Sequence, residues 1–272
     1  MNRLKHIRHL ALDMDGTIYS GGTLFDSTRP FLALLGELGI GHTFLTNNSS
    51  KSSKDYLAHL RKIGIMADAD QLYTSTQAAI EYLREQMPAV RRLFILGTAS
   101  MRAEMEASGF ASTADSPQDE PDAVVVGFDT ELTYARLCRT AYWVSRGKPF
   151  VATHPDRVCP TDQPTVLVDC GAVCAAIEQA AGRGPDTVLG KPHPCMLRGI
   201  LHRHALAPEE LGMVGDRLYT DMAMATKAGA VGVLVLTGET TAAAATKHSP
   251  PPDLVLPGLA ELGERLRAAR QS

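Results

Sequence analysis

Short apolar runs alternate with segments of helical spacing along the whole chain. Phe31, Leu34 and Leu38 repeat at the three- and four-residue intervals of an amphipathic helix. This pattern predicts strands at residues 9–15, 42–45, 92–97, 122–127, 150–153, 211–216 and 232–236, and helices at 27–38, 56–63, 100–108, 132–145, 171–181, 196–204, 222–228 and 259–269. Strands that alternate with helices over short connections form a parallel, doubly wound α/β sheet.

The alternation also predicts how the chain divides into domains. A second α/β unit runs from residue 77 to residue 185, between two segments that share the first pattern. We therefore predict one doubly wound domain made of residues 1–76 and 186–272, with a smaller α/β domain, residues 77–185, inserted into it. Residues 113–121 and 238–252 are polar or rich in Ala, Thr and Pro, which predicts loops with at most a short helix.

The composition is that of an ordinary soluble enzyme. The 272 residues are 44% hydrophobic and 21% charged, with a net charge of -3. No basic excess indicates a nucleic-acid partner, and no apolar segment suits a membrane span or a secretory signal, so we expect a cytoplasmic protein. The five cysteines include no Cys-x-x-Cys pair and are interpreted as reduced, small apolar side chains.

The first predicted strand ends in two acids. Asp13 and Asp15 are two residues apart, and side chains at that spacing on an extended chain point the same way, which predicts a shared pocket. Two carboxylates held close together are costly unless a cation lies between them, and Mg²⁺ prefers oxygen ligands. The alternative is that both are ordinary turn residues before Gly16.

Further polar residues follow other predicted strands. Thr46 ends the second strand and Asp216 ends a later one, and ligands of doubly wound sheets bind beyond such carboxyl ends. Lys191 stands between Gly190 and a proline, which constrains its backbone. Acids, a hydroxyl and a lysine are the groups that phosphoryl transfer through a covalent intermediate requires. Helix capping is the alternative role for Thr46.

Four short motifs occur in order along the chain. They are Asp-Met-Asp-Gly-Thr at 13–17, Leu-Thr-Asn-Asn at 45–48, Gly-Lys-Pro at 190–192 and Gly-Asp-Arg-x-x-Thr-Asp at 215–221. Together they resemble the motifs of the haloacid dehalogenase (HAD) superfamily. The insert, with Val-Gly-Phe-Asp at 126–129 and Ala-Ala-Ile-Glu at 175–178, resembles the subfamily IIA, or NagD-like and p-nitrophenylphosphatase-like, branch. The resemblance implies a Rossmann-like HAD core with an inserted C2-type cap domain.

The resemblance also implies roles for residues of the motifs. Asp13 would attack phosphorus, and Asp15 would act as general acid and base. The phosphoryl group would be held by Gly16, Thr46, Asn47 and Lys191. The ligands of Mg²⁺ would be Asp13, the backbone carbonyl of Asp15, and Asp216, with Asp221 supporting the site. The position of Asp221 also predicts that it opens the helix at 222–228.

The predicted cap departs from the family pattern at two places. Relatives commonly have Asn where this chain has His154, and Asp169-Cys170-Gly171 replaces their usual Gly-x-Gly. His154 and Asp156 are therefore candidates for substrate contact, and the alternative for His154 is a partly exposed loop histidine.

The function that follows is a Mg²⁺-dependent phosphatase acting through an aspartyl-phosphate on Asp13. Its substrate would be a small phosphomonoester of the nucleotide, sugar phosphate, phosphoglycolate or pyridoxal phosphate type. The alternatives are a phosphotransferase or mutase, a non-catalytic phosphometabolite sensor, and a phosphoaspartate signalling module, which would leave the insert without a purpose. Trp143 beside Tyr142 suggests a homodimer contact, and burial within the cap is the simpler interpretation of Trp143.

Overall fold

The computed structural model describes residues 2–161 and 163–271, which fall into two compact units. The first unit holds the residues up to 46, residues 57–73 and the residues from 191 onward, and the second holds residues 47–56 and 74–190. Residues 47–56 thus belong to the second unit, whereas the sequence predicted them in the doubly wound domain of residues 1–76 and 186–272. Side chains explain this, because Ser49 Oγ accepts a hydrogen bond of 2.8 Å from the Phe128 backbone N–H, and Thr98 Oγ1 donates one of 2.9 Å to the Ser50 carbonyl.

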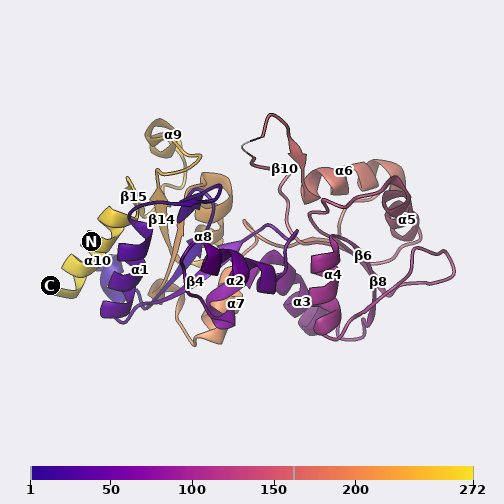
Figure 1. Cartoon of the computed structure of the whole chain (residues 1–272), viewed down its shortest axis with the longest axis horizontal. Coiled ribbons are helices and arrows are strands. Elements are labelled where there is room, and N and C mark those ends of the chain that lie inside the picture. Colours follow the sequence, from indigo (N-terminus) through magenta and orange to yellow (C-terminus); the bar gives the residue numbers. More distant parts are fainter. Residues whose placement is uncertain (1, 162, 272) are drawn as a thin grey trace. The chain divides into compact units, whose positions relative to one another are not determined.

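A six-stranded sheet forms the centre of the first unit (Figure 1). Its order is β15 (Leu254–Leu256), β14 (Val231–Val235), β13 (Leu211–Gly215), β1 (His9–Asp13), β4 (Gly41–Thr46) and β5 (Leu72–Thr74). The strands from β15 to β4 pair in parallel, and all residues of β1, β13 and β14 are buried, as expected for strands covered on both faces. The chain continues from β1 to β4 on one side, and β13 lies on the other, so the carboxyl end of β1 is a topological switch point.

Helices and two short hairpin strands complete this unit. They are η1 (Asn2–His6), β2 (Tyr19–Ser20), β3 (Thr23–Leu24), α1 (Thr28–Glu37), the end of α2 (Ser53–Lys62), η2 (Ala69–Gln71), α7 (Cys195–Arg203), η3 (Pro208–Glu210), α8 (Ala223–Ala228), α9 (Ala242–Lys247) and α10 (Leu259–Gln271). The helix α10 packs against both α1 and η1 (Figure 1), which brings the first and last helices of the chain together. The predicted doubly wound α/β fold is confirmed.

The second unit has its own parallel sheet. Its order is β12 (Thr187–Val188), β9 (Phe150–Ala152), β8 (Ala123–Val126), β6 (Arg92–Leu96) and β7 (Ala111–Ser112). The remaining elements are α3 (Ser75–Gln86), α4 (Ala99–Ala107), α5 (Tyr134–Ser145), α6 (Cys170–Ala181) and the hairpin β10 (Val158–Cys159) and β11 (Leu167–Val168). Trp143 is 3% exposed and packs in the core with Phe150 and Ile177, which confirms its interpretation as a core residue.

The helix α3 and the turn before α8 differ from what the sequence predicts. The helix α3 was not predicted, although Thr74 and Gln77 form a capping box at its start and Ile80 and Leu83 face the core. The prediction that Asp221 opens a helix is wrong, because Asp221 lies within a π-helical turn, Leu218–Met222, that leads into α8. A π-turn adds a residue to the helical repeat, so periodicity gives no sign of it.

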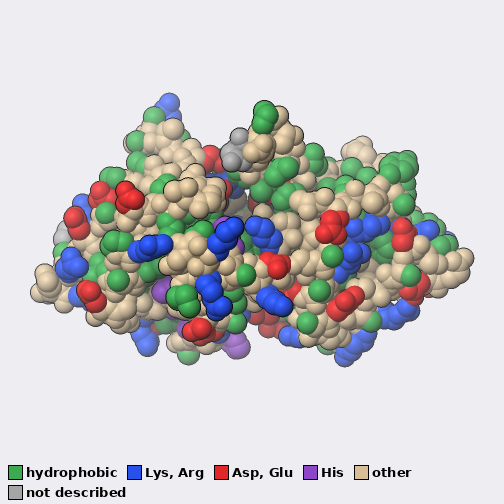
Figure 2. Space-filling model, in the orientation of Figure 1, with side chains coloured by type: hydrophobic (Ala, Val, Ile, Leu, Met, Phe, Trp, Pro, Cys, Tyr) green, Lys and Arg blue, Asp and Glu red, His purple; other side chains and the backbone are tan. Residues whose placement is uncertain are grey.

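The surface carries charges of both signs. On the face shown in Figure 2, Lys and Arg side chains are interspersed with Asp and Glu. Exposed hydrophobic side chains occur on and beside the β10–β11 hairpin, where Val158, Val166 and Val168 are 53%, 65% and 58% exposed. Among the described residues, no helix combines the length and the apolar character needed to cross a membrane. The five cysteines are free thiols.

Candidate active site

Three carboxylates converge at the carboxyl ends of the central strands of the first unit. Asp13 is the last residue of β1, Asp216 follows β13 directly, and Asp221 lies in the π-turn after it. One ligand oxygen of each lies within 4.8 Å of the others. The residues are 8%, 2% and 0% exposed, so water screens their mutual repulsion poorly.

Lys191 provides the positive charge at this cluster. Its Nζ forms ion pairs with Asp13 Oδ1 and, at 2.8 Å, with Asp221 Oδ1. Burial would lower the pKa of Lys191, but the carboxylates of Asp13 and Asp221 raise it above its usual value. The ammonium is therefore a fixed charge at neutral pH.

One ammonium does not balance three carboxylates. Burial, and then the charge of Asp13, raise the pKa of Asp216 to about 6. Burial raises the pKa of Asp221 to about 7; Asp13 adds to the rise, while Lys191 opposes it. Asp216 Oδ1 is buried and has no hydrogen-bond partner among the described residues. An oxygen-rich set with excess negative charge and an unpaired buried oxygen fits a hard divalent cation.

The backbone comes unusually close to Asp216. Gly16 has a φ of +83°, and a Cβ at this position would lie 2.6 Å from Asp216 Oδ2. The same oxygen accepts a 2.6 Å hydrogen bond from the Glu239 backbone N–H, and Thr237 Oγ1 donates one of 2.6 Å to the Gly16 carbonyl. The sequence predicted a loop after β14 but not its contact with Asp216. Only Gly238 in this loop indicated that the backbone could approach another group closely.

The two aspartates of the first motif have different surroundings. Asp15 is exposed, and its Oδ1 accepts a 3.1 Å hydrogen bond from the Gly21 backbone N–H. Among the described residues, the acidic cluster that includes Asp13 does not include the Asp15 carboxylate. The strand ends at Asp13, so the alternation that predicted a shared pocket does not extend to Asp15. Thr17, which the sequence did not single out, donates a 3.2 Å hydrogen bond to Asp13 Oδ2.

The other predicted phosphate-binding residues lie, along the sequence, where one unit ends and the other begins. Thr46 is the last residue of β4 in the first unit, and Asn47 is the first residue of the second. Gly190 ends the second unit directly before Lys191. Within the second unit, Asn47 Nδ2 donates a 3.1 Å hydrogen bond to Asp156 Oδ2.

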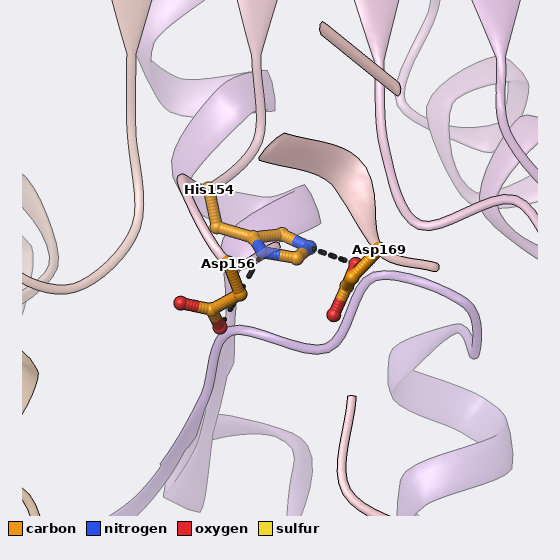
Figure 3. Close-up of side chains that lie close together, drawn as sticks. All are labelled: His154, Asp156 and Asp169. Carbon is orange, nitrogen blue, oxygen red and sulfur yellow. Dashed lines mark ion pairs between the residues drawn. The ribbon is translucent and has the colours of Figure 1, made fainter. Parts of the chain in front are cut away.

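His154 lies in the second unit with an acidic residue on either side (Figure 3). Its Nδ1 is 3.5 Å from Asp156 Oδ2, and its Nε2 is 3.5 Å from Asp169 Oδ1. The ring is fully buried, so its interpretation as a partly exposed loop histidine is wrong. Asp169, which the sequence marked only as a departure from the family pattern, caps α6 by accepting a 2.6 Å hydrogen bond from the Cys170 N–H.

Comparison with protein families matches the chain in two regions. A family described as haloacid dehalogenase-like hydrolase matches residues 10–111, and one described as HAD-hydrolase-like matches residues 188–262. An acid sugar phosphatase from Staphylococcus saprophyticus is 30% identical over 97% of this chain and 99% of its own length.

Solved structures agree with this assignment. The 4-nitrophenylphosphatase from Thermotoga maritima is 38% identical with a TM-score of 0.91, covering 97% of this chain and 99% of that one. NagD from E. coli K-12 is 29% identical with a TM-score of 0.84, over 94% and 98%. Glycerol phosphate phosphatase from Mycobacterium tuberculosis, in complex with magnesium, is 30% identical with a TM-score of 0.88, over 97% and 79%. The chain therefore belongs to the haloacid dehalogenase-like hydrolases, and within them to the NagD-like phosphatases.

Proposed function

We propose that this chain is a Mg²⁺-dependent phosphomonoesterase that works through an aspartyl-phosphate on Asp13. The observation that carries the proposal is the buried cluster of Asp13, Asp216 and Asp221 around the Lys191 ammonium. A nucleophilic carboxylate needs a nearby cation to approach an anionic phosphoryl group, and this cluster offers both charges at the switch point of the sheet.

Different residues carry out the attack on phosphorus and the proton transfers. An oxygen of Asp13 attacks phosphorus, the bond from phosphorus to the ester oxygen breaks, and Asp15 donates a proton to the departing alcohol. Asp15 then takes a proton from water, which attacks the phosphoaspartate and releases phosphate with Asp13 restored. Lys191 and the Thr46 hydroxyl bind phosphoryl oxygens, and Gly16 and Asn47 are further candidates from the same motifs. The exposed position of Asp15 suits a group that exchanges protons with solvent.

The metal-binding residues are Asp13, Asp216 and the backbone carbonyl of Asp15, with Asp221 supporting them. The raised pKa values of Asp216 and Asp221 support this assignment, because burial disfavours their charged forms and the charge of Asp13 adds to the effect, so a bound cation would stabilise the ionised carboxylates. When bound, Mg²⁺ supplies positive charge that offsets the repulsion between the carboxylates and the phosphate.

The proposed substrate is a small phosphomonoester. The relatives compared above are named acid sugar phosphatase, 4-nitrophenylphosphatase and glycerol phosphate phosphatase, and sugar phosphates, 4-nitrophenyl phosphate and glycerol phosphate share a phosphate on a small organic group. The inserted unit, residues 77–185 in the predicted boundaries, is the proposed cap that selects this group.

Phosphate release from these three substrates, nucleotides, phosphoglycolate and pyridoxal phosphate tests the proposal. We expect turnover on some members with Mg²⁺, none with EDTA, and none for Asp13→Asn, which keeps nearly the same shape. Asp26→Asn is the matched control, because Asp26 is an exposed acid of the same unit. If none of these substrates releases phosphate with Mg²⁺ present, the result would favour a sensor. Transfer of phosphate to an added alcohol in place of water would favour a phosphotransferase.

A further inference from the structure

The two departures from the family pattern in the predicted cap lie together in space. These departures are His154 in one loop and Asp169 and Cys170 in another. In the second unit these residues form one buried group, in which Asp169 faces His154 Nε2 (Figure 3) and Cys170 lies at 0% exposure. His154 and Asp169 therefore lie within ion-pair distance of each other in the interior of this unit.

Backbone hydrogen bonds hold the two loops of this group against each other. The Gly171 N–H donates to the Asp156 carbonyl at 2.7 Å, and the Asp169 N–H donates to the Arg157 carbonyl at 3.0 Å. A Cβ on Gly171 would lie 2.1 Å from the Pro155 carbonyl oxygen, so the approach requires glycine. The Asp169 carboxylate is thereby fixed by the backbone, as well as by the cap that it forms on α6.

The group is connected to two segments of the proposed phosphate site. Asp156 Oδ2 faces His154 Nδ1 and also accepts the hydrogen bond from Asn47 Nδ2, so one oxygen links the imidazole to the amide. Gly190, which precedes Lys191, packs on the same residues: a Cβ there would lie 2.7 Å from His154 Cβ and 2.8 Å from Asn47 Oδ1. The ring of His154 therefore supports the residues next to Thr46 and Lys191 in the sequence.

The geometry suits a protonated imidazole better than a metal ligand. The two carboxylates face opposite ring nitrogens, each at 3.5 Å, whereas metal ligands must converge on one point. A protonated ring carries a positive charge that attracts the carboxylate on either side. Nδ1 makes no hydrogen bond to a described residue, so its contact with Asp156 is an ion pair, and Ser49 Oγ lies 3.4 Å from Nε2. Burial alone would lower the pKa of His154, but Cys170 and the carboxylates of Asp156 and Asp169 raise it to about 9.

We propose that Asp169, His154 and Asp156 form an ionic clamp whose purpose is to hold the Asn47 side-chain amide in position for binding the substrate phosphate. His154 is in this account a positioning residue that acts through Asp156, and its complete burial favours this role over direct contact with substrate. The inference rests on the proposed function, because it takes Asn47 as a phosphate ligand.

The clamp has a defined pH range. Burial raises the pKa of Asp169 to about 6, although His154 opposes the rise, so Asp169 and His154 are both charged between about pH 6 and pH 9. The titratable groups that act on the ring are Asp156, Asp169 and Cys170. Residues 47–50 and Gly190, which pack around it, carry no ionisable side chain. Deprotonation of His154 above pH 9 removes the charge that holds Asp156.

Nuclear magnetic resonance of the wild-type protein tests the clamp without any turnover. The ¹⁵N resonances of His154 and the side-chain amide of Asn47, assigned with His154→Asn and Asn47→Asp, are followed from pH 6 to pH 10. We expect both to change with one shared midpoint near pH 9, and we expect Asp169→Asn to lower that midpoint. An Asn47 amide that does not follow the His154 titration would overturn the proposal, as would unchanged midpoints in Asp169→Asn.

Kinetics with 4-nitrophenyl phosphate and Mg²⁺ give a second readout. His154→Asn should raise KM by about tenfold, the size of one lost hydrogen bond, with kcat changed by less than about threefold. His202→Asn, an exposed histidine on α7, is the control and should leave both unchanged. An unchanged KM in His154→Asn overturns the clamp. If the wild type shows no turnover but the His154 and Asn47 resonances still change with one midpoint, the proposed function is refuted. The link between the clamp and Asn47 would then stand on its own.

Addition of Zn²⁺ tests the alternative that His154, Asp156 and Asp169 form a metal site. If the ion removes the proton from a His154 ring nitrogen and shifts its ¹⁵N resonance, the group is a metal site and the clamp is wrong. We expect the His154 signals to stay those of an imidazolium.

Discussion

The unbalanced charge of the acidic cluster predicts how the stability of the metal-free enzyme depends on pH. The perturbation is Asp221→Asn, which removes one fully buried carboxyl group and nearly keeps its shape. Burial raises the pKa of Asp221 from 3.8 to about 7. A group whose pKa is raised on folding contributes stability below its unfolded pKa and loses that contribution as the pH rises through its folded pKa.

The magnitude follows from this shift. Between pH 5 and pH 8 the folded Asp221 loses its proton, whereas the unfolded group is already ionised at pH 5. One pKa unit corresponds to about 1.4 kcal/mol, so most of the shift, about 3 kcal/mol, is lost from the free energy of unfolding across this interval. The wild type in EDTA should therefore lose about 3 kcal/mol more than Asp221→Asn over this range.

Urea unfolding in EDTA at pH 5, 6, 7 and 8 measures this difference. Titrating groups that do not interact with Asp221 contribute equally to both proteins and cancel in the comparison, because independent sites add. Mg²⁺ should restore most of the lost stability of the wild type at pH 8, because a ligand that binds only the folded state stabilises it. Equal pH dependence of the two proteins would refute the proposed excess of negative charge at this cluster.

Two substitutions with matched controls test other parts of the fold. Gly16→Ala should weaken Mg²⁺ binding, measured by calorimetry, because its Cβ would displace Asp216, whereas Gly21→Ala, also at positive φ but with nothing within 4 Å, should cost only about 1 kcal/mol of stability. Equal metal affinity in the two variants would contradict the close approach. Thr74→Ala should lower the free energy of unfolding by about 1 kcal/mol, because the helix α3 loses its cap. The control, Thr246→Ala on the exposed side of α9, should lower it by less than about 0.5 kcal/mol. A Thr74 effect no larger than that of Thr246 would argue against the cap.

The sequence predicted those parts of the fold that repeat a short pattern. Continuous apolar runs such as residues 232–236 predicted the buried parallel strands, here Val231–Val235, and Asp13 and Asp216 were placed together because both stand at the carboxyl ends of such strands. The roles of Asp13, Asp15 and Lys191 came from family motifs and stay predictions. Contacts between distant segments, such as Thr237 on the Gly16 carbonyl, leave no periodic trace in the sequence.

Three features depended on tertiary contacts. Residues 47–56 join the second unit through hydrogen bonds to Thr98 and Phe128 that local sequence does not encode. Asp15 leaves the acidic cluster because β1 ends two residues earlier. His154 is buried beside Asp169, fifteen positions along the chain, and the sequence showed only that both residues depart from the family pattern.

The most direct test of the central claim is to look for the phosphoryl group on Asp13. The enzyme is mixed with Mg²⁺ and 4-nitrophenyl phosphate, quenched in acid within the first turnover, digested and examined by mass spectrometry. We expect the peptide containing Asp13 to gain the mass of one phosphoryl group, hydroxylamine to remove it, and Asp13→Asn never to show it. Sustained turnover with a phosphoryl group on any other residue would contradict the assignment of Asp13 as the nucleophile.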